Sequence, residues 1–375
     1  MKKLDTVLQK QPLYPFRFEP IYKNYLWGGH RFRDLFRRPI PAEDNIVAES
    51  WEISDHPQGL SVIRNGQLCG LTLHDILLSH PLELFGADYI NPNILPNTLP
   101  NSPNLPNSPN LPKRFPLLLK YLDAAQPLSI QVHPNDTFVQ KSSFGDLGKT
   151  EAWVVVAAEP DSFIWVGTRK PYTVQEQEHL IRNGQWDLLL NRVKVQPGDC
   201  FFIPPGTLHA LGAGVLVAEV QTSSDITFRI FDWNRLDLNG KPRELKIEEG
   251  IKVLQNPGLP IAAQQPLKTR DIHCEQLVID KNFTINRWTL NEPNIWYNDH
   301  RCHLWTVLEG TLVISFTAGR RSGIIKNSER EVDPDAIEIL QQGDSILIPA
   351  VCRHLHCIPE NDCQTIFLDV FPDNF

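Results

Sequence analysis

The stretch GDCFFIPPGTLH, at residues 198–209, decides the fold, and GDSILIPAVCRH, at residues 343–354, repeats it. Gly, Asp, Ile, Pro and His recur at the same offsets in the two copies. Each copy reads as a turn, a short strand, a proline that ends strand pairing and a histidine just past the bend. The second copy has Val351 where the first has Gly206. Two such copies predict two similar β-domains in one chain.

Short runs of β-type residues, bounded by Gly, Pro, Asn and Asp, surround both copies. Many short strands separated by turn residues predict an all-β barrel or sandwich. The expected strands are 59–64, 115–122, 128–133, 152–157, 162–166, 200–203, 215–221 and 226–231, followed by 283–290, 303–308, 311–316, 337–340, 345–348 and 365–370.

Three helices are expected among these strands. Thr72 and Thr173 each precede an acidic residue by three positions, which is the pattern of a capping box. Apolar residues at Ile247, Ile251 and Leu254 form a helical stripe that fits packing against a sheet. The expected helices are 73–79, 173–182 and 244–254.

The tract at residues 91–112 differs from the rest of the chain. It has seven Pro in 22 residues, almost no charge and no apolar periodicity. Each proline removes a backbone donor and moves its predecessor out of helical geometry. We therefore expect an exposed, extended or disordered insert, with a proline-rich docking ligand as the alternative.

The composition excludes several classes of protein. The chain has 375 residues, of which 41% are hydrophobic and 21% charged, with a net charge of −8. This predicts a globular protein of two to three domains and argues against partners such as nucleic acid or an anionic membrane. The N-terminus lacks the apolar segment of a signal peptide, and the seven Cys form no C-x-x-C pair. These features predict a cytoplasmic protein without disulfides, and they leave its protein partners unknown.

Metal-type side chains occur in three strand or strand-end segments. The alternation of a strand places Gln131 and His133 on one face. Lys149 and Glu151 share a face in the same way, and His209 follows the bend of the first repeat. One amide oxygen, two imidazoles and one carboxylate form a nitrogen and oxygen set that suits Zn²⁺ and other divalent first-row metals.

Basic residues lie close to this set in sequence. Lys120 interrupts an apolar strand, so its ammonium group should face a cavity or pair with an acid. Asp225 and Arg229 fall on one face of a predicted strand but about 13 Å apart, so we expect them to have different partners. Cations beside a metal predict an anionic or enolate-forming substrate.

Several of these segments, in this order and spacing, resemble the type I mannose-6-phosphate isomerases, and most closely their shorter bacterial branch. The resemblance runs from about residue 21 to 243 and extends more weakly to the C-terminus. The segments that carry it are YLWGG (25–29), ESWEIS (49–54), LKYLDA (119–124), QVHPND (131–136), GKTE (148–151), the first repeat (198–209) and TFRIFDWNR (227–235).

The resemblance implies a mainly β bicupin, with two β-barrel or jelly-roll domains and a few added helices. Residues 1–258 would form an N-terminal catalytic cupin with helical insertions at about 172–190 and 242–256 and the Pro/Asn-rich insert at 91–112. Residues 259–375 would form a degenerate C-terminal cupin. His354 lacks an upstream Gln-x-His and Glu set, so we expect no metal in that domain.

The resemblance also implies the site. One Zn²⁺ per chain would be bound by Gln131, His133, Glu151 and His209. Arg229 corresponds to the active-site arginine of the family, and three further positions correspond to its sugar phosphate site. The residues implied in catalysis are Arg229, Lys120, Lys149 and Asp225, and those implied in substrate binding are Lys120, Lys149 and Arg229.

The implied activity is a zinc-dependent aldose–ketose isomerisation of mannose 6-phosphate and fructose 6-phosphate through a cis-enediol. The general base stays open among Asp225, a metal-bound hydroxide and a lysine with a lowered pKa. Two alternatives are a metal-dependent cupin oxygenase and a non-catalytic sugar-binding bicupin. Oxygenase cupins usually have H-x-H or H-x-D where this chain has Gln131-x-His133, and the retained ligands, lysines and arginine argue against loss of catalysis.

Overall fold

The computed structural model describes residues 11–40, 46–87, 112–142, 144–236, 240–316, 337–360 and 363–373. The chain divides into two compact units, each built from discontinuous segments. We call the unit of Ile21–Glu52 and Leu117–Gln265 the first barrel, and the unit of Met1–Pro20, Ile53–Pro116 and Pro266–Phe375 the second barrel. The division into catalytic and degenerate domains at residue 258 stays a prediction.

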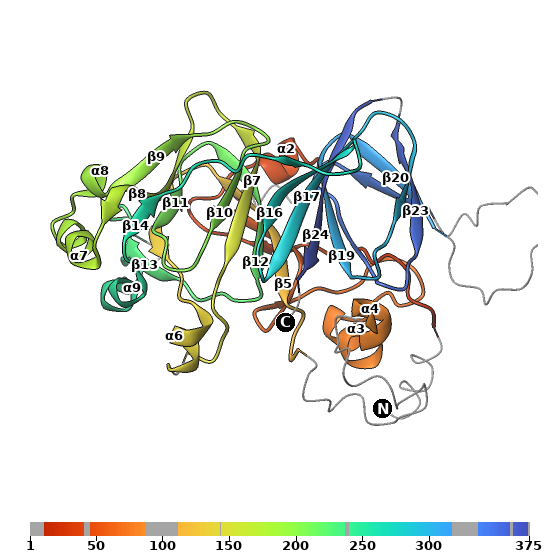
Figure 1. The fold of residues 1–375 in the computed structure, drawn as a ribbon, viewed down its shortest axis with the longest axis horizontal. Helices are drawn as coiled ribbons and strands as arrows, with labels where there is room; N and C mark the ends of the chain where they lie inside the picture. Colours follow the sequence, from red (N-terminus) through yellow and green to blue (C-terminus); the bar gives the residue numbers. More distant parts are fainter. Residues whose placement is uncertain are drawn as a thin grey trace, which may run out of the picture. The chain divides into compact units, whose positions relative to one another are not determined.

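The first barrel consists of two antiparallel sheets (Figure 1). The first sheet has the order β1 (Ile21–Lys23), β2 (Glu49–Ile53), β5 (Leu117–Ala124), β12 (Val215–Thr222), β7 (Glu151–Ala158) and β10 (Cys200–Ile203). The second has the order β13 (Phe228–Phe231), β6 (Ile130–Val132), β11 (His209–Leu211), β8 (Phe163–Tyr172) and β14 (Gly258–Pro260), and β9 (Leu190–Lys194) pairs with β8.

Two apolar clusters position the second sheet of the first barrel. One cluster joins residues of both sheets, such as Val155 and Val166, and forms the barrel interior. The other joins the outer face of the second sheet to helices, with Ile130, Ile181 and Ile251 among its members. Because alternate strand residues point to opposite faces, the polar residues between these apolar positions point into the barrel. The covering helices are α7 (Val174–Arg182), α8 (Trp186–Leu189) and α9 (Ile247–Val253), and α2 (Arg31–Asp34) and α6 (Asp136–Gln140) complete this unit (Figure 1).

The second barrel repeats the strand order of the first, except that its described residues include no counterparts of β13 and β14. Its first sheet runs β15 (Leu267–Lys268), β16 (Cys274–Ile279), β17 (Phe283–Leu290), β24 (Thr365–Pro372), β19 (His303–Glu309) and β22 (Ser345–Ile348). Its second runs β18 (Asn294–Tyr297), β23 (His354–Pro359), β20 (Thr311–Ser315) and β21 (Ile337–Gln341). A hairpin of β3 (Asp55–His56) and β4 (Gly59–Leu60) and the helices α3 (Leu73–Ser79) and α4 (Pro81–Phe85) belong to the same unit. The predicted mainly β, bicupin fold is therefore confirmed.

Most predicted elements are present, with differences at their ends. The helix 73–79 has the bounds of α3, and α7 starts at Val174, after its N-cap Thr173, and ends at Arg182 as predicted; both have the predicted capping box. The third helix is shorter than the predicted 244–254, because α9 covers only Ile247–Val253. The strand predicted at 226–231 starts later, at Phe228, and the run at 59–64 contains only β4. Apart from Pro112, the tract at 91–112 lies outside the described residues.

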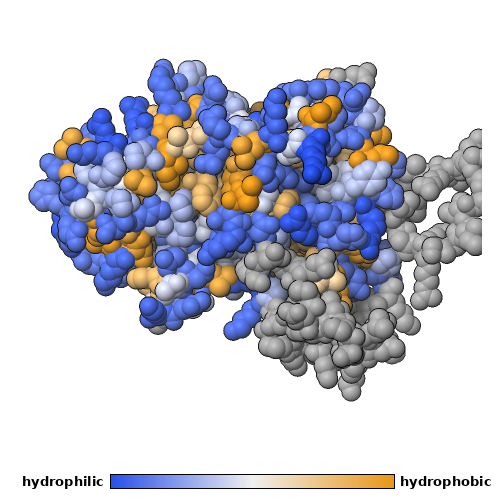
Figure 2. All heavy atoms as spheres, viewed as in Figure 1, coloured by the Kyte–Doolittle hydropathy of each residue, from blue (hydrophilic) through white to orange (hydrophobic). Residues whose placement is uncertain are grey.

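On the face shown in Figure 2, hydrophilic residues predominate, and hydrophobic residues form several groups among them. Among the described residues, no helix is long and apolar enough to cross a bilayer.

Candidate metal centre

Strand β6 presents two of the predicted ligands to the interior of the first barrel. Ile130 and Val132 are buried in the cluster under the helices. The alternate residue Gln131 and the following His133 point the opposite way, as predicted, and contact His209.

The bend after β10 delivers His209 to the same place. Gly206 has a φ of +84°, and a Cβ there would lie 2.5 Å from the carbonyl oxygen of Val253. The bend therefore requires glycine, because other residues rarely adopt this φ and the close backbone leaves no room. Beyond the bend, His209 begins β11 and pairs with Gln131 of β6 on one side and Val166 of β8 on the other.

The third segment contributes Glu151, which begins β7 and is fully buried. Lys149 lies two residues before β7, outside the strand, and its Nζ lies 3.0 Å from the Glu151 Oε2. The two side chains therefore meet, although strand alternation does not apply to Lys149.

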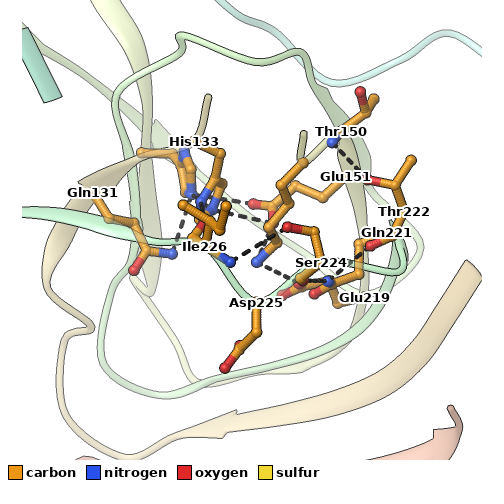
Figure 3. A network of polar contacts seen from close by, with 12 residues as sticks. Gln131, His133, Thr150, Glu151, Glu219, Gln221, Thr222, Ser224, Asp225 and Ile226 are labelled. Carbon is orange, nitrogen blue, oxygen red and sulfur yellow. Dashed lines mark hydrogen bonds and ion pairs between the residues drawn. The ribbon is translucent and has the colours of Figure 1, made fainter. Parts of the chain in front are cut away.

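These residues converge at one point of the barrel interior (Figure 3). The Nε2 atoms of His133 and His209 are 3.1 Å apart. Glu151 Oε1 lies 3.1 Å from the His209 Nε2, and Glu151 Oε2 lies 3.4 Å from the His133 Nε2. One ligand atom from each residue lies within 4.8 Å of the others. His133 and Glu151 are 18 residues apart in the sequence, and Glu151 and His209 are 58 apart, yet their ligand atoms meet in a space that one ion could span.

The donor chemistry of the cluster fits a metal ion. His133 donates its Nδ1–H to the carbonyl of Ile226 at 2.8 Å, and His209 donates its Nδ1–H to the carbonyl of Thr207 at 2.9 Å. Both Nε2 atoms therefore carry a lone pair directed at the other and at the Glu151 carboxylate. Burial, reinforced by the charge of Lys149, lowers the pKa of His133 to about 3 and keeps this imidazole in the neutral form that binds metals.

Gln131 lies beside the same point. Its amide Nε2 is 3.2 Å from the His209 Nε2. The two ends of an amide have almost the same shape, so a half-turn of the amide brings Oε1 to this position. Gln131 can then serve as a neutral oxygen ligand.

Two buried lysines line the cluster, and both are paired. Lys120 Nζ lies 3.4 Å from the Glu219 Oε1 and 3.5 Å from the Glu49 Oε2, which confirms the expected acidic partner. Lys149 Nζ is 3.4 Å from the same Glu219 oxygen. Burial opposes the charge of both lysines, but the surrounding carboxylates outweigh it and raise their pKa values.

Glu219 is a further charged residue of this cluster, and it was not predicted from the sequence. It is buried on β12 directly opposite Lys120 of β5, and it also accepts a hydrogen bond from the Trp153 Nε1 at 3.1 Å. Burial and the nearby Glu151 raise its pKa. The sequence contains a signal for this residue, because Glu219 interrupts an apolar strand as Lys120 does. A buried charge needs a partner of opposite charge, so the two residues could have been paired.

Arg229 and Asp225 have separate partners, as expected. Arg229 lies on β13, where its Nε donates to Ser129 Oγ at 3.3 Å. Asp225 lies before the start of β13, so the strand alternation that placed the two residues on one face does not apply there. Figure 3 shows the Asp225 side chain pointing away from the imidazoles. The structure thus brings the four predicted ligands and two lysines together but leaves Asp225 outside that group.

Two further arginines surround Arg229 and were also missed. Arg235 and Arg243 both pair with the Asp232 carboxylate. Burial, together with the charges of Arg243 and Arg235, lowers the pKa of Arg229. Three guanidinium groups against one carboxylate leave this region with an excess of positive charge.

The chain is similar to known proteins of one family. Residues 15–149 match the family model of the phosphomannose isomerase type I catalytic domain. Mannose-6-phosphate isomerase ManA of Bacillus subtilis is 37% identical over 304 residues, which cover 79% of this chain and 86% of ManA. Mannose-6-phosphate isomerase of Streptococcus mutans is 36% identical over 266 residues, 71% of this chain and 76% of that protein.

The fold agrees as well. The crystal structure of the mannose 6-phosphate isomerase from Bacillus subtilis superposes with a TM-score of 0.78 at 29% identity, covering 95% of this chain and 99% of the other. These relatives are named as isomerases, so they support an isomerase over the oxygenase and over the non-catalytic alternative. The chain belongs to the mannose-6-phosphate isomerase family and is an enzyme of that family.

Proposed function

We propose that the protein is a zinc-dependent isomerase that interconverts mannose 6-phosphate and fructose 6-phosphate through a cis-enediol. One Zn²⁺ per chain would be held by Gln131, His133, Glu151 and His209. The observation that carries this proposal is the convergence of two imidazole nitrogens and a carboxylate within 4.8 Å. Family membership supports the substrate.

The ligand chemistry supports zinc. The set contains nitrogen and oxygen donors and no thiolate, and with three or four protein ligands it leaves room for a ligand from solvent or substrate. A bound Zn²⁺ would supply a Lewis acid for sugar oxygens. The ion pairs around it join three carboxylates (Glu49, Glu151, Glu219) to two lysines (Lys120, Lys149), and these five groups sum to −1, which a divalent ion would change to +1.

A positive site suits the difficult step of the reaction. Isomerisation removes a weakly acidic proton from a carbon beside a carbonyl, and negative charge develops on oxygen. Lys120 and Lys149 would donate hydrogen bonds to the sugar oxygens, because their carboxylate neighbours keep them charged. The same raised pKa values argue against a neutral lysine as the general base. Arg229 would stabilise the enediolate. Asp225 stays a candidate for proton transfer only if the reacting carbons of the substrate bind next to its carboxylate.

The phosphate needs a different set of cations. Both lysines are buried and already have carboxylate partners, so a dianion would compete with those partners. The guanidinium groups of Arg229, Arg235 and Arg243 carry three positive charges against the single charge of Asp232. Guanidinium groups bind phosphate well through paired N–H donors. We therefore assign the phosphate end of the substrate to Arg235 and Arg243, which leaves Arg229 for the enediolate.

A coupled assay tests the function. Protein treated with a chelator and dialysed would be supplied with mannose 6-phosphate, and fructose 6-phosphate formation would be measured before and after addition of one equivalent of zinc. We expect activity to be lost on depletion and restored by zinc. Equal turnover by the depleted protein would contradict zinc dependence, and no turnover in any state would contradict the isomerase assignment.

We also propose that the enzyme acts in the cytoplasm. Its seven cysteines are all free, which fits a reducing compartment.

A further inference from the structure

The internal repeat identifies the residue of the second barrel that corresponds to Glu151. In the first barrel, Ile203 of β10 lies opposite Glu151 of β7. In the second, Ile348 of β22 lies opposite His303 of β19. Ile203 and Ile348 are the same position of the repeated motif. His303 therefore occupies the place of the carboxylate ligand.

A second correspondence supports the first. Glu219 lies opposite Trp153, two residues after Glu151. In the second barrel Asp369 lies opposite Trp305, two residues after His303. Both barrels thus keep a tryptophan and a buried acid at equivalent positions.

The charges at the remaining positions are changed. Lys120, the neighbour of Glu219 across the first barrel's sheet, corresponds to Asn286, the neighbour of Asp369. The second barrel has therefore lost the lysine that neutralises the buried acid. His303 provides a cation in its place.

The contacts of His303 define its protonation. Its Nδ1 lies 2.6 Å from an Asp369 oxygen, and its Nε2 lies 2.9 Å from an Asp299 oxygen. Ionised carboxylates only accept hydrogen bonds, whereas a neutral imidazole has a single N–H to donate. Both contacts are satisfied only when both ring nitrogens carry a proton.

His303 is buried among aromatic rings. It is 2% exposed, with the rings of Trp296 and Phe371 at centroid distances of 4.8 and 5.0 Å. Among the described residues, the charged groups that face it are Asp369 from β24 and Asp299 from the segment after β18. Arg301 pairs with the far side of Asp299 and with Asp373.

We propose that His303 is an imidazolium at neutral pH that bridges Asp299 and Asp369, and that this bridge occupies in the second barrel the position that would hold metal in the first. The second barrel then depends on a proton where the first depends on zinc. The contrast with zinc rests on the proposed function, but the proton bridge itself does not.

The bridge predicts the direction of pH dependence. Burial disfavours the charged ring, but Asp369 and Asp299 outweigh burial and raise the pKa of His303 to about 9. Because this value exceeds the unfolded value of about 6.5, the stabilisation is complete below pH 6.5 and is lost as the pH rises through 9. The unfolding equilibrium constant of the second barrel should rise on the order of a hundredfold between pH 6 and pH 10.

Two measurements on the full chain test the bridge. The first is the nitrogen NMR spectrum of protein labelled in its histidine rings. At pH 7.5 we expect both nitrogens of His303 to be protonated, and excess zinc to leave them unchanged while it shifts His133 and His209. A neutral His303, or a zinc-induced shift of its resonances, would overturn the proposal. Unshifted His133 and His209 would instead overturn the proposed metal centre and leave the bridge intact.

The second measurement is urea unfolding of wild type, His303→Gln and His356→Gln, followed by hydrogen exchange in peptides from β19 and β24. His356 is an exposed histidine of the same unit and serves as the control. At pH 7 we expect His303→Gln to raise the unfolding constant of these strands about a hundredfold and to remove its rise at alkaline pH. A His303→Gln protein with the stability and pH profile of His356→Gln would overturn the proposal, and if it fails to fold the NMR result decides.

Discussion

Substitution of Glu219 by glutamine tests the charge balance beneath the candidate metal centre. The Glu219 Oε1 lies 3.4 Å from both the Lys120 Nζ and the Lys149 Nζ, and all three side chains are buried. At an effective dielectric constant of about 20, one such pair has a Coulomb energy of about 5 kcal/mol, part of which offsets the desolvation of the charges. Removal of one partner of a buried pair typically destabilises a protein by about 3–5 kcal/mol.

We therefore expect Glu219→Gln to lower the free energy of unfolding of the first barrel by about 3–5 kcal/mol at pH 7. The assay is urea unfolding of the zinc-supplemented full chain, with hydrogen exchange of peptides from β5 and β12 to report on this unit. Glu159→Gln is the matched control, because its carboxylate pairs with Arg31 at 2.9 Å but is 67% exposed. An exposed pair should contribute less than about 1 kcal/mol.

A double substitution separates charge from packing. Lys120→Met combined with Glu219→Gln removes one positive and one negative charge. The double substitution should therefore lower the free energy of unfolding by less than the sum of the two single substitutions. The reasoning would be refuted if Glu219→Gln resembled Glu159→Gln, or if the effects of the two buried substitutions were simply additive.

Further predictions concern catalysis, metal content and the bend. Arg229→Ala should lower kcat at least about a hundredfold in the coupled assay, the scale of one contact to developing charge, and near-normal turnover would remove it from the chemistry. Arg243→Ala should chiefly raise KM for the phosphorylated sugar, and an unchanged KM would contradict the proposed phosphate end. His209→Ala should lose bound metal, measured by elemental analysis against zinc-loaded wild type, and a stoichiometry of one would refute its role as a ligand. Gly206→Val, which copies the second repeat, should also lower zinc affinity, because its side chain would meet the Val253 carbonyl; unchanged affinity would show that the bend tolerates a side chain.

The features predicted best from the sequence are those that depend on adjacent residues, such as the two faces of a strand and the cap of a helix. Ile130 and Val132 face the apolar cluster while Gln131 faces the site, because the period of a strand fixes both faces at once. The two capping boxes predicted the starts of α3 and α7 well, since a cap is read from four adjacent residues.

Features that depend on pairing across the fold could not be predicted in this way. Glu219 meets Lys120 only because β12 pairs with β5. The sequence of neither strand determines the register of this pairing. The same holds for His303, whose equivalence to Glu151 appears only when the pairing of β19 with β22 is known. The strand alternation used to relate Asp225 to Arg229 does not apply, because β13 starts at Phe228, two residues later than predicted.

The proposed function depends on one ion bound by two imidazoles, one carboxylate and one amide from three distant segments. X-ray absorption at the zinc edge of the loaded protein tests it most directly. We predict nitrogen and oxygen neighbours at about 2.0–2.1 Å, with the outer-shell scattering of two imidazole rings and no sulfur. A sulfur neighbour at about 2.3 Å, or fewer than two imidazoles, would contradict the account.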